Sequence, residues 1–319
     1  MATIDMSLYT DTQDALDNVT RDTTNGDVFE YPDGWTETTT GNLDFSLYGN
    51  PTALAPLEMK GLGANTITLG GVWIQFNDHF ILNNLNFTSS TTVIGSANGS
   101  SYVLCKDCTF DVSGTSGVVY DRGHVKFVRC HIKGGSTRMF RNGPHMFYDC
   151  VLDNCSNYGN GTYLQYYNCL FINDARAVGE RIDCYRCTFV GSTYGIYSDN
   201  FSANDCVFKD CGWGVIGINS TTRGLIGVLR NNIFYGSTSG DTLFNAPLID
   251  ENNEYNAASD PVPNSGLGDY TTVNVLNNYQ DRGNIGDGSA LYTGGSNGRG
   301  AILSYPDTST IPHPLRSTR

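Results

Sequence analysis

A short polar segment carries the residues that could most readily do acid–base chemistry. The residues of interest in it are the carboxylates Asp174, Glu180 and Asp183 and the arginines Arg181 and Arg186. Glycoside hydrolysis needs two carboxyl groups about 5–10 Å apart, and an arginine beside them could bind an acidic sugar. Asp174, Glu180 and Asp183 are therefore the candidate catalytic residues. A solvated turn is the simpler interpretation of the same segment, and it is preferred.

Ten cysteines are the other candidates for chemistry. The pairs Cys105/Cys108 and Cys184/Cys187 are C-x-x-C motifs, which in other proteins indicate zinc or redox chemistry. No histidine or further cysteine pair has the spacing of a metal-ligand set. The sequence therefore predicts no metal site and no cofactor. So many thiols without an export signal predict folding in a reducing cytoplasm.

Most of these cysteines belong to a repeat. A phrase such as Asn-Asp-Cys-Val-Phe recurs, with variations, nine times between Phe80 and Tyr255. Its central position, called the anchor, is occupied by Leu85, Cys108, Cys130, Cys150, Cys169, Cys187, Cys206, Asn232 and Asn253. Successive anchors lie 18 to 26 residues apart, and an apolar residue stands two positions after each one. This periodicity is that of a repeat protein.

The pattern around each anchor predicts two short strands joined by a bend. Apolar residues alternate with polar ones, as in a half-buried strand. The anchor lies three residues after the preceding apolar residue. In a straight strand, an odd separation would place the two side chains on opposite faces, so the chain must bend between them if both point inward. The residue before the anchor is Asn or Asp in seven repeats and Arg in two. Asn and Asp tolerate the left-handed conformation that a one-residue corner requires.

These corners predict a ladder of thiols inside the coil, where thiols pack as small apolar groups. The ladder consists of Cys108, Cys130, Cys150, Cys169, Cys187 and Cys206. Cys155 and Cys211, five positions after an anchor, are expected on exposed turns.

A third apolar run follows a Gly/Ser-rich stretch in several repeats, as in Gly-Val-Val-Tyr at 117–120. Three short strands closing every 18 to 26 residues describe one coil of a parallel β-solenoid. Over residues 27–255 the sequence resembles the right-handed parallel β-helix (pectate-lyase-like) superfamily. The resemblance predicts an all-β, single-stranded right-handed parallel β-helix of about nine to eleven coils. It implies little about activity, because lyases, hydrolases and structural fibres share this fold.

The opening of the repeat region carries a second resemblance. Residues 26–34 (Gly-Asp-Val-Phe-Glu-Tyr-Pro-Asp-Gly) look like the first coil of the superfamily, and residues 55–61 look like the strand that follows. This form of the opening resembles β-helix virion proteins of tailed bacteriophages, as well as secreted polysaccharide-active enzymes.

Three regions follow from these patterns. Residues 1–26 are an acidic cap, in which Thr10 and Gln13 form a capping box for a short helix. Residues 27–255 form the β-helix. Residues 256–319 are an irregular region ending in an extended arm that contains Pro306, Pro312 and Pro314.

Outward positions of the predicted coils carry aromatic and apolar residues. Tyr148, Tyr167 and Tyr185 lie two positions before an anchor, and Val151, Leu170, Val207 and Ile233 lie one position after. Solvated monomers rarely expose such rows, so we expect these residues to form the contact of a homotrimer. A platform for sugar rings and simple stacking between coils are the alternatives for the tyrosines.

Charge and hydropathy argue against a nucleic-acid partner and a membrane-spanning segment. A net charge of −13 disfavours a nucleic-acid partner. No apolar run is long enough to span a membrane, and the first residues predict no secretory signal. We expect a structural virion protein of a tailed bacteriophage, made in the host cytoplasm. It would be a capsid decoration (cement) or fibre-like component without catalytic activity, bound to other capsid or tail proteins.

The alternative is an enzyme. A polysaccharide lyase or glycoside hydrolase of the tailspike depolymerase type would act in a groove on the outer face of the β-helix. A surface glycan is accordingly a further candidate partner.

Overall fold

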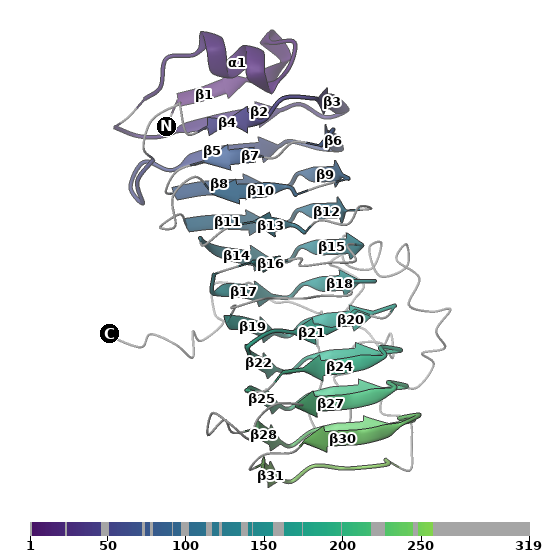
Figure 1. Cartoon of the computed structure of the whole chain (residues 1–319). Coiled ribbons are helices and arrows are strands. Elements are labelled where there is room, and N and C mark those ends of the chain that lie inside the picture. Colours follow the sequence, from purple (N-terminus) through teal and green to yellow (C-terminus); the bar gives the residue numbers. More distant parts are fainter. Residues whose placement is uncertain are drawn as a thin grey trace.

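The computed structural model describes residues 2–22, 24–45, 51–71, 74–76, 79–90, 92–96, 102–112, 117–120, 123–134, 140–141, 143–155, 163–173, 175–198, 200–217, 227–244 and 248–257. These residues form a parallel β-solenoid of about nine turns, with a short helix near the N-terminus (Figure 1). The fold predicted from the repeat is thereby confirmed.

The longest sheet, here called the first sheet, has twelve parallel strands. In order along the sheet they are β1 (Ala2–Asp5), β2 (Asp27–Tyr31), β5 (Leu57–Gly61), β8 (His79–Asn83), β11 (Tyr102–Lys106), β14 (His124–Val128), β17 (His145–Tyr148), β19 (Tyr163–Tyr167), β22 (Arg181–Tyr185), β25 (Phe201–Asn204), β28 (Gly227–Arg230) and β31 (Leu248–Glu251). Each coil contributes one strand, so equivalent residues of successive coils lie side by side.

The second sheet has ten strands. They are β3 (Trp35–Thr39), β6 (Asn65–Leu69), β9 (Asn86–Ser89), β12 (Thr109–Val112), β15 (His131–Gly134), β18 (Val151–Asp153), β20 (Leu170–Ile172), β23 (Thr188–Val190), β26 (Val207–Lys209) and β29 (Ile233–Tyr235).

Two shorter sheets form the remaining side of the coils. One contains β4 (Leu43–Asp44), β7 (Ile74–Phe76), β10 (Ile94–Ser96), β13 (Val119–Tyr120) and β16 (Phe140–Arg141). The other contains β21 (Ala177–Val178), β24 (Tyr194–Tyr197), β27 (Trp213–Gly217) and β30 (Gly240–Phe244).

A left-handed residue turns the chain from the first sheet into the second, as the sequence predicts. All nine residues that precede an anchor have positive φ. They are Asn84, Asp107, Arg129, Asp149, Asn168, Arg186, Asp205, Asn231 and Asn252, with φ between 51° and 61°. This corner reverses the strand alternation, so the anchor side chain points into the coil. The six anchor cysteines are at most 1% exposed and belong to the apolar core.

A second left-handed corner follows four positions after the anchor. Gly134, Asn154, Asn173, Gly191, Asp210 and Gly236 have φ between 51° and 77°. The residue after this corner points inward again, so Cys155 and Cys211 are fully buried. The expectation that these two thiols are exposed is wrong, because it took a turn residue to be a solvent-facing one.

Stacked aromatic rings fill the core beside the cysteines. Phe171, Phe189, Phe208, Phe234 and Tyr255 form one continuous column, with neighbouring ring centroids 4.3–5.0 Å apart. In the last coils the anchors are asparagines that satisfy buried backbone groups. Asn232 Nδ2 donates to the carbonyl of Ala203 at 3.0 Å.

The N-terminal end of the core is covered by α1 (Thr12–Asn18), which follows the 3₁₀ turn η1 (Met6–Leu8). Ala15 packs in the same cluster as Ile4 and Met6. The helix begins one residue later than expected: its N-cap is Asp11, which accepts from the backbone N–H of Asp14 at 2.8 Å. Asp14 in turn accepts from the backbone N–H of Thr10 at 3.0 Å, so the cap is stabilised from both sides.

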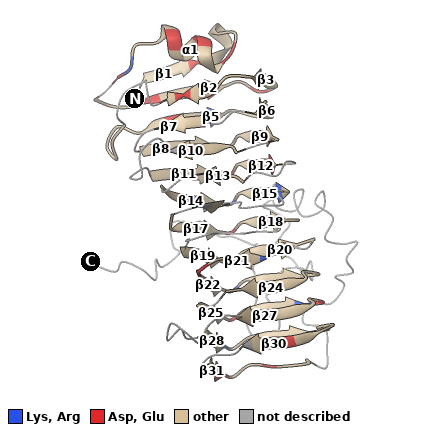
Figure 2. Ribbon diagram, viewed as in Figure 1, with Lys and Arg blue, Asp and Glu red and all other residues tan. Residues whose placement is uncertain are grey.

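Acidic residues mark this end of the rod, and Figure 2 shows them on α1. In the part of the chain that the structure describes, no helix is both long and apolar enough to cross a membrane.

Candidate functional site

The structure describes two of the three predicted catalytic acids. Asp174 lies outside the described residues. Glu180 is exposed in the bend before β22, while Asp183 is half-buried on the outer face of that strand. Asp183 accepts a hydrogen bond from the hydroxyl of Tyr163 on β19, and its carboxylate lies 3.5 Å from the guanidinium of Arg181. Arg186 is a corner residue with φ 53°.

A polar network therefore holds Asp183. The register of β19 and β22 places Tyr163 beside Arg181 and Gln165 beside Asp183. Gln165 Nε2 donates to the hydroxyl oxygens of Tyr163 at 2.7 Å and Tyr167 at 3.3 Å. Arg181 lies over the ring of Tyr163, 4.4 Å from its centroid.

Burial and the hydrogen bond with Asp183 raise the pKa of Tyr163, and burial raises the pKa of Tyr167 to about 12. Both phenols are therefore neutral hydrogen-bonding groups at ordinary pH, and neither is a base.

The tyrosines of the predicted interface row lie on the outer face of the first sheet. Tyr148 and Tyr167 are half-buried and Tyr185 is 44% exposed. The rings of Tyr148 and Tyr167 are stacked, with centroids 4.9 Å apart, and Lys126 Nζ lies 4.6 Å from the Tyr148 centroid. A sugar ring cannot lie flat on a face that another ring covers, so stacking between coils describes this pair.

The four apolar members of that row are not exposed. Val151, Leu170, Val207 and Ile233 are at most 2% exposed in the single chain. They lie on the second sheet, where β18, β20 and β26 are buried on both faces. The expectation of a bare apolar stripe is wrong, because strand alternation says which side a residue faces but not whether that side is covered. These residues cannot be the free surface of a trimer contact.

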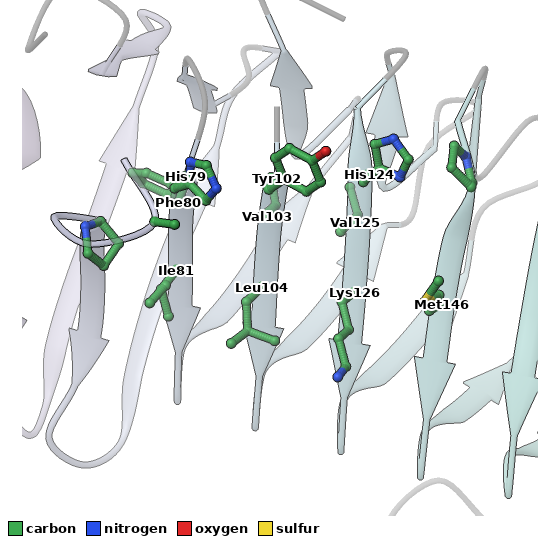
Figure 3. Close-up of a pocket in the computed structure, with 13 residues that line it drawn as sticks. His79, Phe80, Ile81, Tyr102, Val103, Leu104, His124, Val125, Lys126 and Met146 are labelled. Carbon is green, nitrogen blue, oxygen red and sulfur yellow. The ribbon is translucent and has the colours of Figure 1, made fainter. Parts of the chain in front are cut away.

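A groove on the outer face of the first sheet was not foreseen. It has a volume of about 430 Å³ and crosses β8, β11, β14 and β17 (Figure 3). Two rows of outward side chains run across these strands. The ring row consists of His79, Tyr102 and His124; the second row consists of Ile81, Leu104, Lys126 and Met146. Ala53, Pro56 and Pro144 also line the groove.

The ring row presents edges, not faces. The Tyr102 ring is stacked between His79 and His124, with both centroid distances 5.1 Å and interplanar angles of 20° and 13°. Tyr102 is nevertheless 51% exposed. Solvent therefore meets the rim of the stack at Tyr102 and His124, both of which are exposed and can donate or accept hydrogen bonds. His79 is half-buried, and its Nδ1 is buried without a hydrogen-bond partner among the described residues.

The second row supplies apolar surface and one cation. Ile81, Leu104 and Met146 are half-buried, and burial lowers the pKa of Lys126. Across β8, β11, β14 and β17, every residue of which the structure describes, the charged outward side chains are Lys106 and Lys126, and there is no outward carboxylate. The groove is thus locally positive in a chain of net charge −13.

A spacing in the sequence could have revealed the ring row. In the first six repeats, the residues six positions before the anchor are His79, Tyr102, His124, Pro144, Tyr163 and Arg181, and five of these six have planar side chains. This position lies four residues before the one from which the interface tyrosines were predicted, so the prediction did not include it.

Across the described residues, no group of three or more histidine, cysteine, aspartate or glutamate side chains is arranged to hold a metal ion. The chain matches no protein-family model, and no curated protein matches it.

Proposed function

We propose that this protein is a non-catalytic, fibre-like structural component of a tailed-bacteriophage virion that binds an extended saccharide chain. The observation that carries the proposal is the groove across β8, β11, β14 and β17, with polar ring edges on one side and apolar side chains on the other. Ligand pockets commonly combine a mostly apolar lining with a few oriented polar groups.

Saccharides have matching chemistry. A sugar ring has apolar C–H faces and a rim of hydroxyl groups, so its face would pack on Ile81, Leu104 and Met146. Its hydroxyls would meet the hydroxyl of Tyr102 and the imidazole of His124, the two exposed members of the ring row. Neighbouring strands repeat the same groups about 4.8 Å apart, and this periodicity favours a chain of similar units over a single compact ligand.

The placement in a virion rests on other support. The opening segment, residues 26–34, resembles that of β-helix virion proteins. The acidic cap formed by residues 1–26 offers a charged end for docking on a capsid or tail protein (Figure 2). The homotrimer stays a prediction, and the exposed ring of Tyr185 is now its most accessible contact residue.

A depolymerase is the second candidate, and one observation favours it. Asp183 and Arg181 lie on the same outer face as the groove, five strands from its first strand, β8, along the first sheet. A saccharide extending from the groove toward β22 would reach them, with exposed Glu180 as the second carboxylate.

Binding and cleavage can be measured on the same samples. We expect the purified protein to bind at least one polysaccharide on a glycan panel without releasing reducing ends. Tyr102→Ala should abolish most of this binding, while Tyr185→Ala, a matched change of an exposed outer tyrosine outside the groove, should not. Release of reducing ends would favour the depolymerase, and equal binding by both variants would remove the groove from the proposal.

A further inference from the structure

We infer that the groove selects an anionic saccharide chain, one that carries carboxylates along its length, and that Lys126 is the residue that reads the charge. This inference rests on the proposed saccharide-binding function and adds the chemical class of the ligand.

The first support is the charge balance of the groove. Lys126 lines it directly, and Lys106 is the last residue of the neighbouring strand β11. No carboxylate faces outward on β8, β11, β14 or β17, whose residues are all described. An anion entering here meets two lysines and no repelling acid on these strands.

The acids on either side of the groove are already engaged. Toward the N-terminus, Glu58 accepts a hydrogen bond from Asn83 Nδ2 at 2.9 Å, and Glu30 pairs with Lys60 at 2.7 Å. Toward the C-terminus, Asp183 is held by Tyr163 and Arg181. Glu30 and Asp183 are thereby balanced by Lys60 and Arg181. Glu58 keeps its charge, but it lies on β5, outside the four strands of the groove.

The position of Lys126 is also fixed. Its stem lies in the row of Ile81, Leu104 and Met146, and its ammonium lies over the ring of Tyr148. Tyr148 is itself stacked on Tyr167. A half-buried ammonium is less hydrated than one on an open surface, so a ligand carboxylate beside it gains a stronger interaction. The burial that lowers the pKa of Lys126 agrees with this partial dehydration.

Arg181 does not serve the same purpose. Its guanidinium covers the ring of Tyr163 and lies 3.5 Å from the carboxylate of Asp183. That charge is balanced within the protein. Of the two lysines on the strands of the groove, Lys126 is the one that lines it directly, so it is the charge assigned to the ligand.

The test compares one substitution and three polymers by calorimetric titration at low and physiological salt. Lys126→Met keeps the length and the apolar stem of the side chain but removes the charge. The matched control is Lys133→Met on the second sheet, a 45% exposed lysine that lies 3.5 Å from Asp111. The polymers are alginate, which is a polyuronate, dextran sulfate, and neutral dextran.

We expect alginate to bind the wild type most tightly, with affinity falling as salt rises. Lys126→Met should weaken alginate binding roughly tenfold, as for the loss of one charge-assisted contact, while Lys133→Met should not. Equal binding of dextran and alginate, or an unaffected Lys126→Met variant, would overturn the inference while leaving the proposed function intact. Tighter binding of dextran sulfate would overturn the assignment to carboxylates. Failure of every saccharide on the glycan panel would contradict the proposed function itself.

Discussion

Arg129 pairs with Asp107 of the preceding coil through two nitrogens of its guanidinium, which donate to the two carboxylate oxygens. Nε lies 2.7 Å from Oδ1 and Nη2 lies 2.7 Å from Oδ2. Both residues are corner residues, with φ of 51° and 54°. Arginine has no intrinsic preference for this backbone conformation. The ion pair with Asp107 therefore explains why Arg129 can occupy a corner at which seven other coils have Asn or Asp.

Removing this arginine should destabilise the rod. In Arg129→Ala, the carboxylate of Asp107 loses a partner that is only 7% exposed, and a non-glycine residue still occupies the left-handed corner. We expect a loss of about 2–3 kcal/mol in the free energy of unfolding, measured by urea denaturation. Lys133→Ala, which removes a more exposed lysine near Asp111, should cost less than about 0.5 kcal/mol. Equal midpoints for the two variants would contradict this account of the corner.

Leu170→Glu should affect folding and not assembly. Leu170 is 1% exposed in the single chain, so the substitution would bury a charge without a partner. We expect a loss of roughly 3 kcal/mol or more, seen as a lower urea midpoint. Light scattering of the folded fraction should give the parent mass. A stable variant of lower mass would restore the predicted contact through Val151, Leu170, Val207 and Ile233.

Replacing a cysteine of the thiol ladder by serine should lower the stability of the fold. Cys150 is fully buried in the coil, and its thiol donates to the carbonyl of Tyr148 at 3.2 Å. A hydroxyl can keep that hydrogen bond, but it is more costly to bury than a thiol. We therefore expect Cys150→Ser to lower the free energy of unfolding by roughly 1–3 kcal/mol. Cys150→Ala separates this polar cost from the loss of volume, and an unchanged urea midpoint for the serine variant would contradict the inward placement of the anchor.

The N-terminal cap should become less stable as pH rises. Glu37 is 7% exposed and accepts from Thr12 Oγ1 at 2.7 Å, Thr12 N at 3.2 Å and Trp35 Nε1 at 3.3 Å. Burial outweighs these hydrogen bonds and raises the pKa of Glu37 above its ordinary value of 4.5. The folded state therefore binds the proton more tightly than the unfolded chain does. Its stabilising effect is complete below 4.5 and is lost as pH rises through the folded pKa.

Thermal unfolding between pH 4 and pH 8 can detect this titration. Glu37→Gln removes the titrating group and keeps an acceptor oxygen, so its melting temperature should fall less over this range than that of the parent. Parallel curves for the two proteins would show that Glu37 does not carry the effect.

Much of the backbone could be predicted because each corner is specified locally. Asn84 and Asp149 precede their anchors, and a left-handed residue at that position is sufficient to turn the next side chain inward. The inward cysteines follow from the same step. Cys155 was misplaced because its own corner, at Asn154, is four residues after an anchor and was not recognised as a second turn of the same kind.

Whether a side chain is exposed to solvent was harder to predict than the face of the strand on which it lies. Alternation places Leu170 opposite Phe171, but only contacts from outside the strand decide whether that side meets water. A signal was nevertheless present, because Leu170, Phe171 and Ile172 are all apolar. A continuous apolar run indicates a strand covered on both faces.

The groove could not be seen in any single repeat. Each coil contributes one ring, and Tyr102 gains its neighbours only when the register aligns it with His79 and His124. The three rings keep a constant distance of six residues from their anchors, so their alignment was open to prediction. The groove also needs Ala53 and Pro56, which lie before the first anchor and outside the repeated phrase.

The central claim, that the outer face of the first sheet binds a saccharide chain, is tested most directly by where a bound oligosaccharide lies. A crystal structure of the protein with an oligosaccharide of the glycan that binds it most tightly would show this. We predict sugar density along β8, β11, β14 and β17, with an acidic group beside Lys126 and the chain intact. Sugar bound elsewhere, or a cleaved product beside Glu180 and Asp183, would contradict the account.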